Sequence, residues 1–98
     1  MMKILAMDTS NKALSLAILE NKETLGQVTL NIKKNHSITL MPAIDFLMNS
    51  LDLKPTDLNR IAVAHGPGSY TGLRIAVATA KTLAHTLKIE LVGVSSLL

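Results

Sequence analysis

The residues best suited to chemistry lie in two short segments, each of which follows an apolar run. Asp8 and Thr9 come at the end of the first such run, and three glycines and a proline punctuate residues 66–72. A carboxylate and a hydroxyl after a buried strand can contact a phosphate, or they can cap the local turn. A glycine-rich turn that opens a helix can hold a phosphate on its backbone N–H groups, or it can simply be a tight turn. The candidate nucleotide-binding residues are Asp8, Thr9, Gly66, Gly68 and Ser69.

Several other kinds of site are not expected. No Lys-Ser or Lys-Thr pair follows the glycines, which excludes a Walker-type P-loop, and their spacing differs from G-x-G-x-x-G. Asp8 has no evident carboxylate partner for a catalytic metal, because Asp45 and Asp52 fall on a helical pattern and Glu90 opens a distant strand. His36, His65 and His85 form no His-x-x-x-His pair and the chain has no cysteine, so neither zinc nor iron is expected. No serine has the flanks of a nucleophile elbow, which argues against serine hydrolysis.

The composition is that of a globular chain of 98 residues with a modest formal charge of +3. Hydrophobic residues make up 48%, with one Phe and one Tyr, so the core must be largely aliphatic. The basic residues are scattered apart from Lys33-Lys34, and we interpret them as solvated, including those of the last helical pattern. The chain has no cysteine, no apolar run of roughly 18 residues and no signal-peptide pattern, which together predict a cytoplasmic protein without a membrane partner.

The elements that position these residues begin with three strands. Apolar runs at 3–7 and 13–19 and an alternating pattern at 24–32 predict an antiparallel meander, with the first strand central and the third at an edge. Ser37 is a suitable N-cap for a helix that continues to Leu51. Pro42 is expected near the first turn of this helix, where its missing N–H costs least.

The apolar arc of this first helix is wider than one sheet face needs, because Phe46 lies off the main stripe. The extra arc indicates either a partner or ordinary core packing.

The second half of the chain alternates strand and helix. We expect a strand at 61–64, a helix at 71–87 and a last strand at 90–94. Alanines four residues apart on the second helix leave a shallow groove for the close approach of another helix or of the sheet. The order β-β-β-α-β-α-β predicts an α/β fold of the ribonuclease-H-like class, with a five-stranded mixed sheet whose parallel crossovers lie in the second half.

Segments spread over the whole chain carry a resemblance to a known family. They are Ile4-Leu5-Ala6-Met7-Asp8-Thr9-Ser10, His36-Ser37 followed by Leu40-Met41-Pro42, Gly66-Pro67-Gly68-Ser69-Tyr70-Thr71-Gly72-Leu73-Arg74-Ile75, Ala80-Lys81-x-Leu83-Ala84 and Gly93-Val94-Ser95-Ser96-Leu97. In this order they resemble the N-terminal lobe of the TsaB (YeaZ) family, which serves the biosynthesis of threonylcarbamoyladenosine in tRNA.

The resemblance implies a lobe of the actin, Hsp70 and sugar-kinase superfamily. Residues 1–98 are then expected to be the N-terminal lobe of a longer two-lobe protein whose second lobe is absent. It also implies an accessory subunit with no catalytic activity alone. The related catalytic subunit TsaD carries a metal-binding His-x-x-x-His after its corresponding strand, whereas Ser95-Ser96-Leu97-Leu98 contains no histidine.

The implied function is to dimerise with a TsaD-like threonylcarbamoyl transferase and activate it in modifying adenosine next to the anticodon. The implied complex also includes a TsaE-like ATPase. A second copy of the chain is the alternative partner, tRNA is contacted indirectly, and ATP or ADP is expected only in the partner complex. Pairing in the family uses both helices of this lobe. The expected interface comes from a pool of which some members must face the sheet: Leu40, Met41, Ile44, Phe46, Met48, Leu73, Ala76, Val77 and Ala80.

Two rival functions remain. The candidate phosphate-binding residues could belong to the nucleotide-binding lobe of an actin-like ATPase or kinase. A protease is the least favoured alternative, because the chain shows neither a nucleophile with its base nor a pair of metal ligands.

Overall fold

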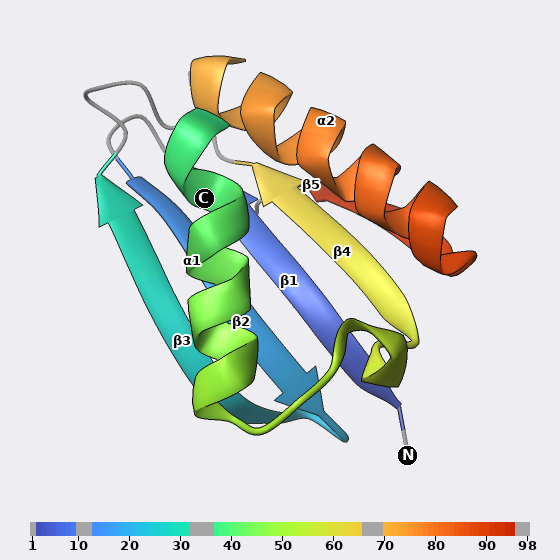
Figure 1. Ribbon diagram of the computed structural model, residues 1–98. Coiled ribbons are helices and arrows are strands. Elements are labelled where there is room, and N and C mark those ends of the chain that lie inside the picture. The colour runs from blue at the N-terminus through green and yellow to red at the C-terminus, as the bar shows by residue number, and fades with distance from the viewer. Residues whose placement is uncertain (1, 10–12, 32–36, 66–69, 96–98) are drawn as a thin grey trace.

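Five strands form one mixed sheet in the order β3-β2-β1-β4-β5 (Figure 1). The computed structural model describes residues 2–9, 13–31, 37–65 and 70–95. The elements are β1 (Lys3–Thr9), β2 (Ala13–Glu20), β3 (Glu23–Asn31), α1 (Ser37–Ser50), the single 3-10 turn η1 (Pro55–Asp57), β4 (Arg60–His65), α2 (Tyr70–Leu87) and β5 (Glu90–Ser95). This order is the one expected from the sequence.

The pairing of the strands confirms the predicted topology. β1 is central and pairs antiparallel with β2 and parallel with β4, β3 is an edge strand antiparallel to β2, and β5 is parallel to β4. β1 is hydrogen-bonded to a strand on each edge and carries apolar residues on both faces, whereas the edge strand β3 alternates and has one polar face. The α/β ribonuclease-H-like architecture is therefore confirmed.

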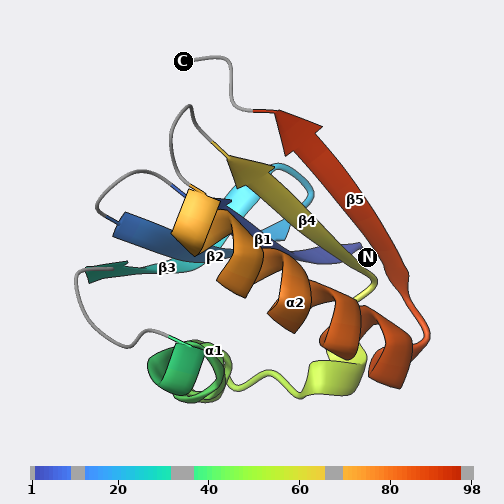
Figure 2. The same ribbon diagram turned by 90° about the horizontal axis from the view of Figure 1, so that it is seen from above.

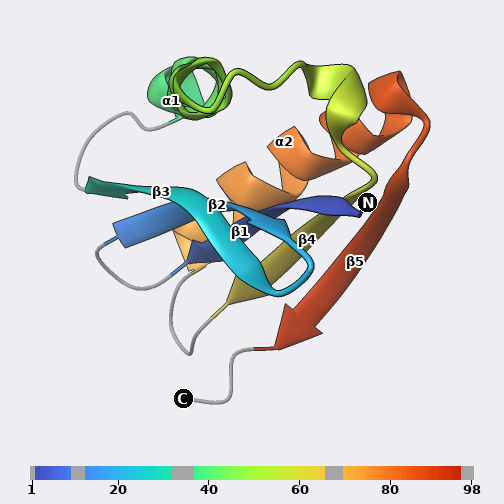
Figure 3. The ribbon, with the colours of Figure 1, turned by 90° about the horizontal axis from the view of Figure 1, so that it is seen from below.

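Both helices cover the same face of the sheet (Figures 2 and 3). The crossovers from β3 to β4 and from β4 to β5 join parallel strands and move across the sheet in the same direction. Because such crossovers are right-handed, they must place their helices on one side. α1 packs on β2 and β3, α2 packs on β1, β4 and β5, and the two helices contact each other.

The core lies between this helix pair and the sheet. Alternate residues of β1, β2 and β4 enter it, and α2 contributes alanines that let the helix approach the strands closely. The groove predicted along α2 is thus occupied by the sheet of the same lobe. The buried core residues are Leu5, Met7, Leu14, Leu16, Ile18, Leu40, Ile44, Leu47, Met48, Leu58, Ile61, Val63, Ala76, Ala80 and Ala84.

Two local features differ from simple expectation. Pro42 lies inside α1 beyond its first turn, so α1 lacks the bond that an N–H there would donate one turn back. The two-residue turn between β2 and β3 holds Asn21 and Lys22 at φ values of 50° and 74°, as a type I′ hairpin requires. Asn often adopts this conformation, but Lys does so at a steric cost.

None of the helices within the described residues is long and apolar enough to cross a membrane.

Candidate functional site

One candidate site lies at the edge of the sheet where the parallel strands β1 and β4 end. The register pairs Asp8 with Ala64 and Thr9 with His65, so both strands reach this edge together. Asp8 is exposed, and its neighbour Met7 is buried in the core. Because successive side chains of a strand alternate, Asp8 lies on the sheet face that α1 and α2 leave uncovered.

The structure places only part of the predicted nucleotide site. Asp8 and Thr9 lie at the carboxyl end of β1, and the backbone of His65 ends β4 beside them. Gly66, Gly68 and Ser69 lie outside the described residues. Within the described ranges no three His, Cys, Asp or Glu side chains gather into a group that could hold a metal ion.

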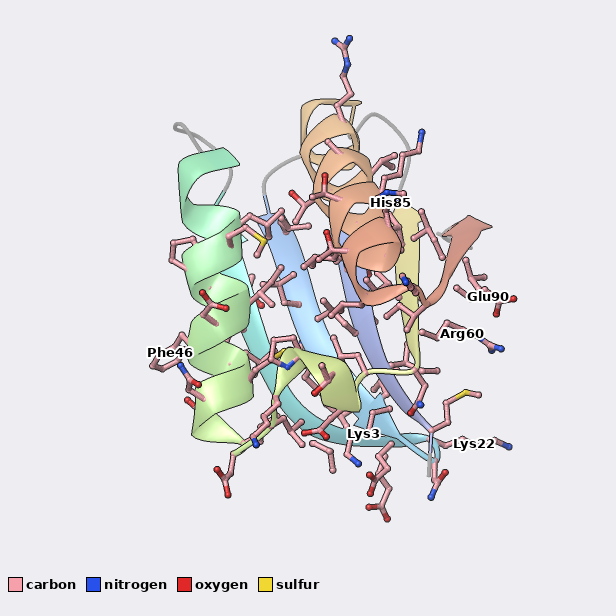
Figure 4. The ribbon with its side chains drawn as sticks, turned by 45° about the vertical axis from the view of Figure 1, so that its right-hand side comes forward. Lys3, Lys22, Phe46, Arg60, His85 and Glu90 are labelled. Carbon is pink, nitrogen blue, oxygen red and sulfur yellow. The ribbon has the colours of Figure 1, made fainter. Side chains whose placement is uncertain are left out.

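Two ion pairs among the described residues lie at the opposite end of the sheet from Asp8. Lys3 Nζ lies 2.9 Å from Oε2 of Glu20, and this hydrogen bond raises the pKa of Lys3, with desolvation acting in the opposite direction. Arg60 Nε lies 2.6 Å from Oε1 of Glu90, but the contact is not aligned as a hydrogen bond. Both pairs join neighbouring strands, so we assign them to the sheet and not to the candidate site (Figure 4).

A second candidate site lies on the outer surface of α1 and α2. Phe46 is 65% exposed and Met41 is 40% exposed, although both are large apolar side chains. Figure 4 shows Phe46 pointing away from the sheet. Isolated exposed apolar residues are common, but two lie on α1 and one of them, Met41, also lines a pocket, so the outer surface of this helix can take part in an interface.

The pocket lies between the helices and has a volume of about 280 Å³. Met41 lines it from α1, and four residues of α2 complete it. The hydroxyl of Thr82 already donates to the backbone oxygen of Ala78 at 3.0 Å, so it needs no further acceptor. The lining is therefore suited to an apolar side chain. The α2 residues of the pocket are Ala78, Thr79, Thr82 and Leu83.

Burial divides the pool of residues predicted for the interface. Met41 and Phe46 are exposed on α1, and Val77 is partly buried against the core. The side chain of Leu73 lies outside the described part of the structure. The remaining members pack in the core between the helices and the sheet: Leu40, Ile44, Met48, Ala76 and Ala80. A charged substitution at any of these five would destabilise the fold, so a loss of pairing in such a variant would not identify an interface residue.

Sequence reasoning did not select Ala78, Thr79 and Thr82 as surface residues of interest. Their small side chains carry no distinct signal in the helical pattern. They become part of a pocket only because α1 lies beside α2, which depends on how both helices pack on the sheet.

Comparison with known proteins supports this architecture. The family model described as "TsaD: tRNA N6-adenosine threonylcarbamoyltransferase" matches residues 14–98. The Bacillus subtilis protein named "tRNA threonylcarbamoyladenosine biosynthesis protein TsaB" is 51% identical over 96 residues, which cover 98% of this chain and 42% of that protein. The chain thus spans less than half the length of this relative.

Two solved structures resemble the fold. YeaZ from Pseudomonas aeruginosa superposes with a TM-score of 0.86 at 33% identity, over 99% of this chain and 45% of that one. RuvC from T. thermophilus, solved with a Holliday junction substrate, has a TM-score of 0.62 at 10% identity, over 97% of this chain and 65% of that one. The second likeness concerns the fold alone. With a relative at 51% identity and a YeaZ structure that superposes over nearly the whole chain, this protein belongs to the TsaB (YeaZ) family, which is named for threonylcarbamoyladenosine biosynthesis in tRNA.

Proposed function

We propose that residues 1–98 form the partner-binding lobe of a non-catalytic subunit in tRNA threonylcarbamoyladenosine biosynthesis. Its partner is a TsaD-like threonylcarbamoyl transferase, which it activates by forming a heterodimer. A tRNA-modifying complex of this kind would work in the cytoplasm, together with a TsaE-like ATPase. In the longer relatives this lobe corresponds to less than half of the protein.

The observation that carries this proposal is the exposed apolar surface on α1 and α2. Met41 lines a pocket of about 280 Å³ between the helices, and Phe46 is exposed on α1 about 140° around the helix from Met41. Full burial of a Phe or Met side chain contributes about 1.5–3 kcal/mol, so covering these two would favour association. We define the pairing surface as Met41, Phe46, Ala78, Thr79, Thr82 and Leu83.

The physical form of the surface is suited to helix-on-helix contact. Small side chains on α2 let a partner helix approach, while the larger ones on α1 can fill a groove on the partner. The same surface could pair with a second copy, because a two-fold axis brings identical patches together. We favour the heterodimer because this chain is itself similar to the TsaD family, so a TsaD-like lobe would present an equivalent pair of helices to this surface.

Light scattering after size-exclusion chromatography tests the proposal with the TsaD-like protein of the same organism. The unchanged chain should form a one-to-one heterodimer, and M41D and F46D should each abolish it. M2D is the matched control, because Met2 is 43% exposed and precedes β1, away from the helices. Circular dichroism should show that all three variants keep the native helix content.

The outcomes separate the possibilities clearly. Heterodimers that survive both M41D and F46D would overturn the pairing surface. Loss of pairing in M2D as well would show a general effect of added charge. A homodimer that the TsaD-like protein does not displace would overturn the choice of partner.

A nucleotide-binding lobe of an actin-like ATPase or kinase is the second candidate. Exposed Asp8 at the shared carboxyl edge of β1 and β4 favours it, because ligands of α/β sheets commonly bind outside the carboxyl ends of strands. Titration with ATP and magnesium tests this function by calorimetry. Saturable binding that D8N weakens would support it, and no binding, alone or with the TsaD-like protein, would remove it.

A further inference from the structure

One edge of α2 exposes several basic side chains, with Ala78 between Arg74 and Lys81. Arg74, Lys81 and His85 are exposed, and Lys88 follows directly after the helix and is also exposed. At 3.6 residues per turn, the spacings of seven and four residues place the first three along one line. From Arg74 to His85 this line extends about 16 Å, at 1.5 Å per residue. We call these four residues the basic edge of α2.

In the part of the chain that the structure describes, no acidic side chain pairs with this edge. The 18 residues of α2 include no Asp or Glu, so the usual stabilising pairs one turn apart are absent from the helix. Glu90 on the neighbouring strand β5 is already paired with Arg60. Among the described residues, no carboxylate lies within ion-pair distance of Arg74, Lys81 or Lys88. The positive charges therefore face solvent and are available to an external anion.

The basic edge borders the pocket at Ala78, which lies four residues after Arg74 and three before Lys81 and also lines the pocket. Thr79 and Leu83 face the pocket beside α1. The helical repeat places Lys81 and His85 on the other side of α2, and Figure 4 shows His85 on the side turned away from α1. A protein that contacts Met41 and Leu83 would thus leave Lys81 and His85 accessible.

We propose that the basic edge of α2 contacts the phosphate backbone of RNA. The fixed positive charges of Arg74, Lys81 and Lys88 along one edge suit the regularly spaced charges of a nucleic-acid strand, and phosphate contacts need no specific pocket. A protein partner is less well suited, because a protein interface normally has apolar or aromatic anchors at its centre, and Ala78 is the small apolar residue that the helix exposes nearby. The choice of tRNA as the RNA rests on the proposed function.

Fluorescence anisotropy with a labelled tRNA transcript tests this inference, using the chain alone and its mixture with the TsaD-like protein. The double variant K81Q/K88Q removes two charges from the basic edge. The matched double variant K22Q/K54Q removes two charges from exposed lysines of the hairpin turn and of the segment before η1. Both variants have the same net charge, so a difference between them reports position.

We expect K81Q/K88Q to weaken tRNA binding about tenfold at low salt and to lower the slope of log affinity against log salt by about 1.5. K22Q/K54Q should remain within about twofold of the unchanged chain at the same salt concentration. Equal weakening in the two variants would overturn the proposal in favour of diffuse attraction. Absence of tRNA binding at low salt, or equal affinity in all three proteins, would overturn it outright.

Light scattering on the same samples separates this inference from the proposed function. If K81Q/K88Q abolishes the heterodimer and leaves tRNA affinity unchanged, the basic edge binds an acidic protein surface and the RNA proposal is wrong. If no heterodimer forms with any variant but the chain alone loses tRNA affinity only in K81Q/K88Q, the basic edge is supported and the proposed partnership fails.

Discussion

Lys3 and Asn59 exchange two hydrogen bonds where β1 begins and β4 is about to begin. The backbone N–H of Lys3 donates to Oδ1 of Asn59 at 2.8 Å, and the backbone N–H of Asn59 donates to the carbonyl oxygen of Lys3 at 2.8 Å. The next residues, Ile4 and Arg60, are the first pair of the parallel ladder. This exchange aligns the two strands at their start, and the ladder then brings Asp8 to the same edge as the end of β4.

Replacing Asn59 with Ala should therefore destabilise the fold. The substitution removes the acceptor of the Lys3 N–H, and we expect a loss of about 1 kcal/mol in the free energy of unfolding. Urea unfolding followed by circular dichroism measures it. N49A is the control, since Asn49 is exposed on α1. If N59A is as stable as N49A, the side-chain bond does not stabilise the register.

Truncation of two adjacent residues of α1 should change the free energy of unfolding by very different amounts. Leu47 is 4% exposed in the core, so L47A should cost about 2–5 kcal/mol through lost burial and the cavity that remains. Phe46 lies on the outer face, and F46A should change the free energy of unfolding by about 0.5 kcal/mol or less. Both values come from urea unfolding of the chain alone. A large loss in F46A would place Phe46 in the core of the free chain.

Gly26 of β3 is close to α1. A Cβ atom at this position would lie 3.0 Å from a methyl carbon of Leu51 and 3.1 Å from one of Leu47. G26A should therefore lower the free energy of unfolding by about 1 kcal/mol through overpacking. The substitution L51A in the G26A background should cost less than it does alone, because it removes the nearest clash.

Gly93 of β5 provides the matched control. Apart from Gly93 itself and its two neighbours in the chain, no residue has an atom within 4 Å of a Cβ built at Gly93. Ala loses less backbone entropy than Gly on folding, so G93A should raise the free energy of unfolding by about 0.5 kcal/mol. Thermal unfolding of both variants checks the contrast, and equal losses in G26A and G93A would refute the packing explanation.

The ion pair between Lys3 and Glu20 should make stability depend on alkaline pH. The hydrogen bond to Glu20 raises the pKa of Lys3, so the folded state holds this proton more tightly than the unfolded state does. The stabilisation is fully present below the ordinary lysine pKa of about 10.4 and is lost as pH rises through the higher pKa of the folded state.

The measurement is the difference in unfolding free energy between the unchanged chain and K3M, from urea titrations at pH 8 to 11. This difference should shrink toward the upper end of the range. K22M serves as the control, since Lys22 makes no ion pair among the described residues. A K3M difference that is constant with pH, or that grows, would contradict the assignment.

The sequence by itself determined the order and class of the elements. Period-two and helical apolar patterns persist over several residues, so they depend on local geometry that every strand or helix shares. They predicted the central β1, the edge strand β3 and the mixed sheet, all of which the pairing confirms. The same patterns could not divide the apolar arc of α1 into core and surface, because Met41 and Met48 have equal hydrophobicity.

Only the tertiary structure decided that division. The packing of α1 on β2 and β3 buries Met48 and leaves Met41 at the junction with α2, where it lines the pocket. Likewise, the alanine groove of α2 turned out to receive the sheet, and its unbalanced basic edge became visible only once the positions of the carboxylates were known. These features depend on contacts between residues distant in sequence, and the chain's local periodicity carries no information on which partner will occupy each face.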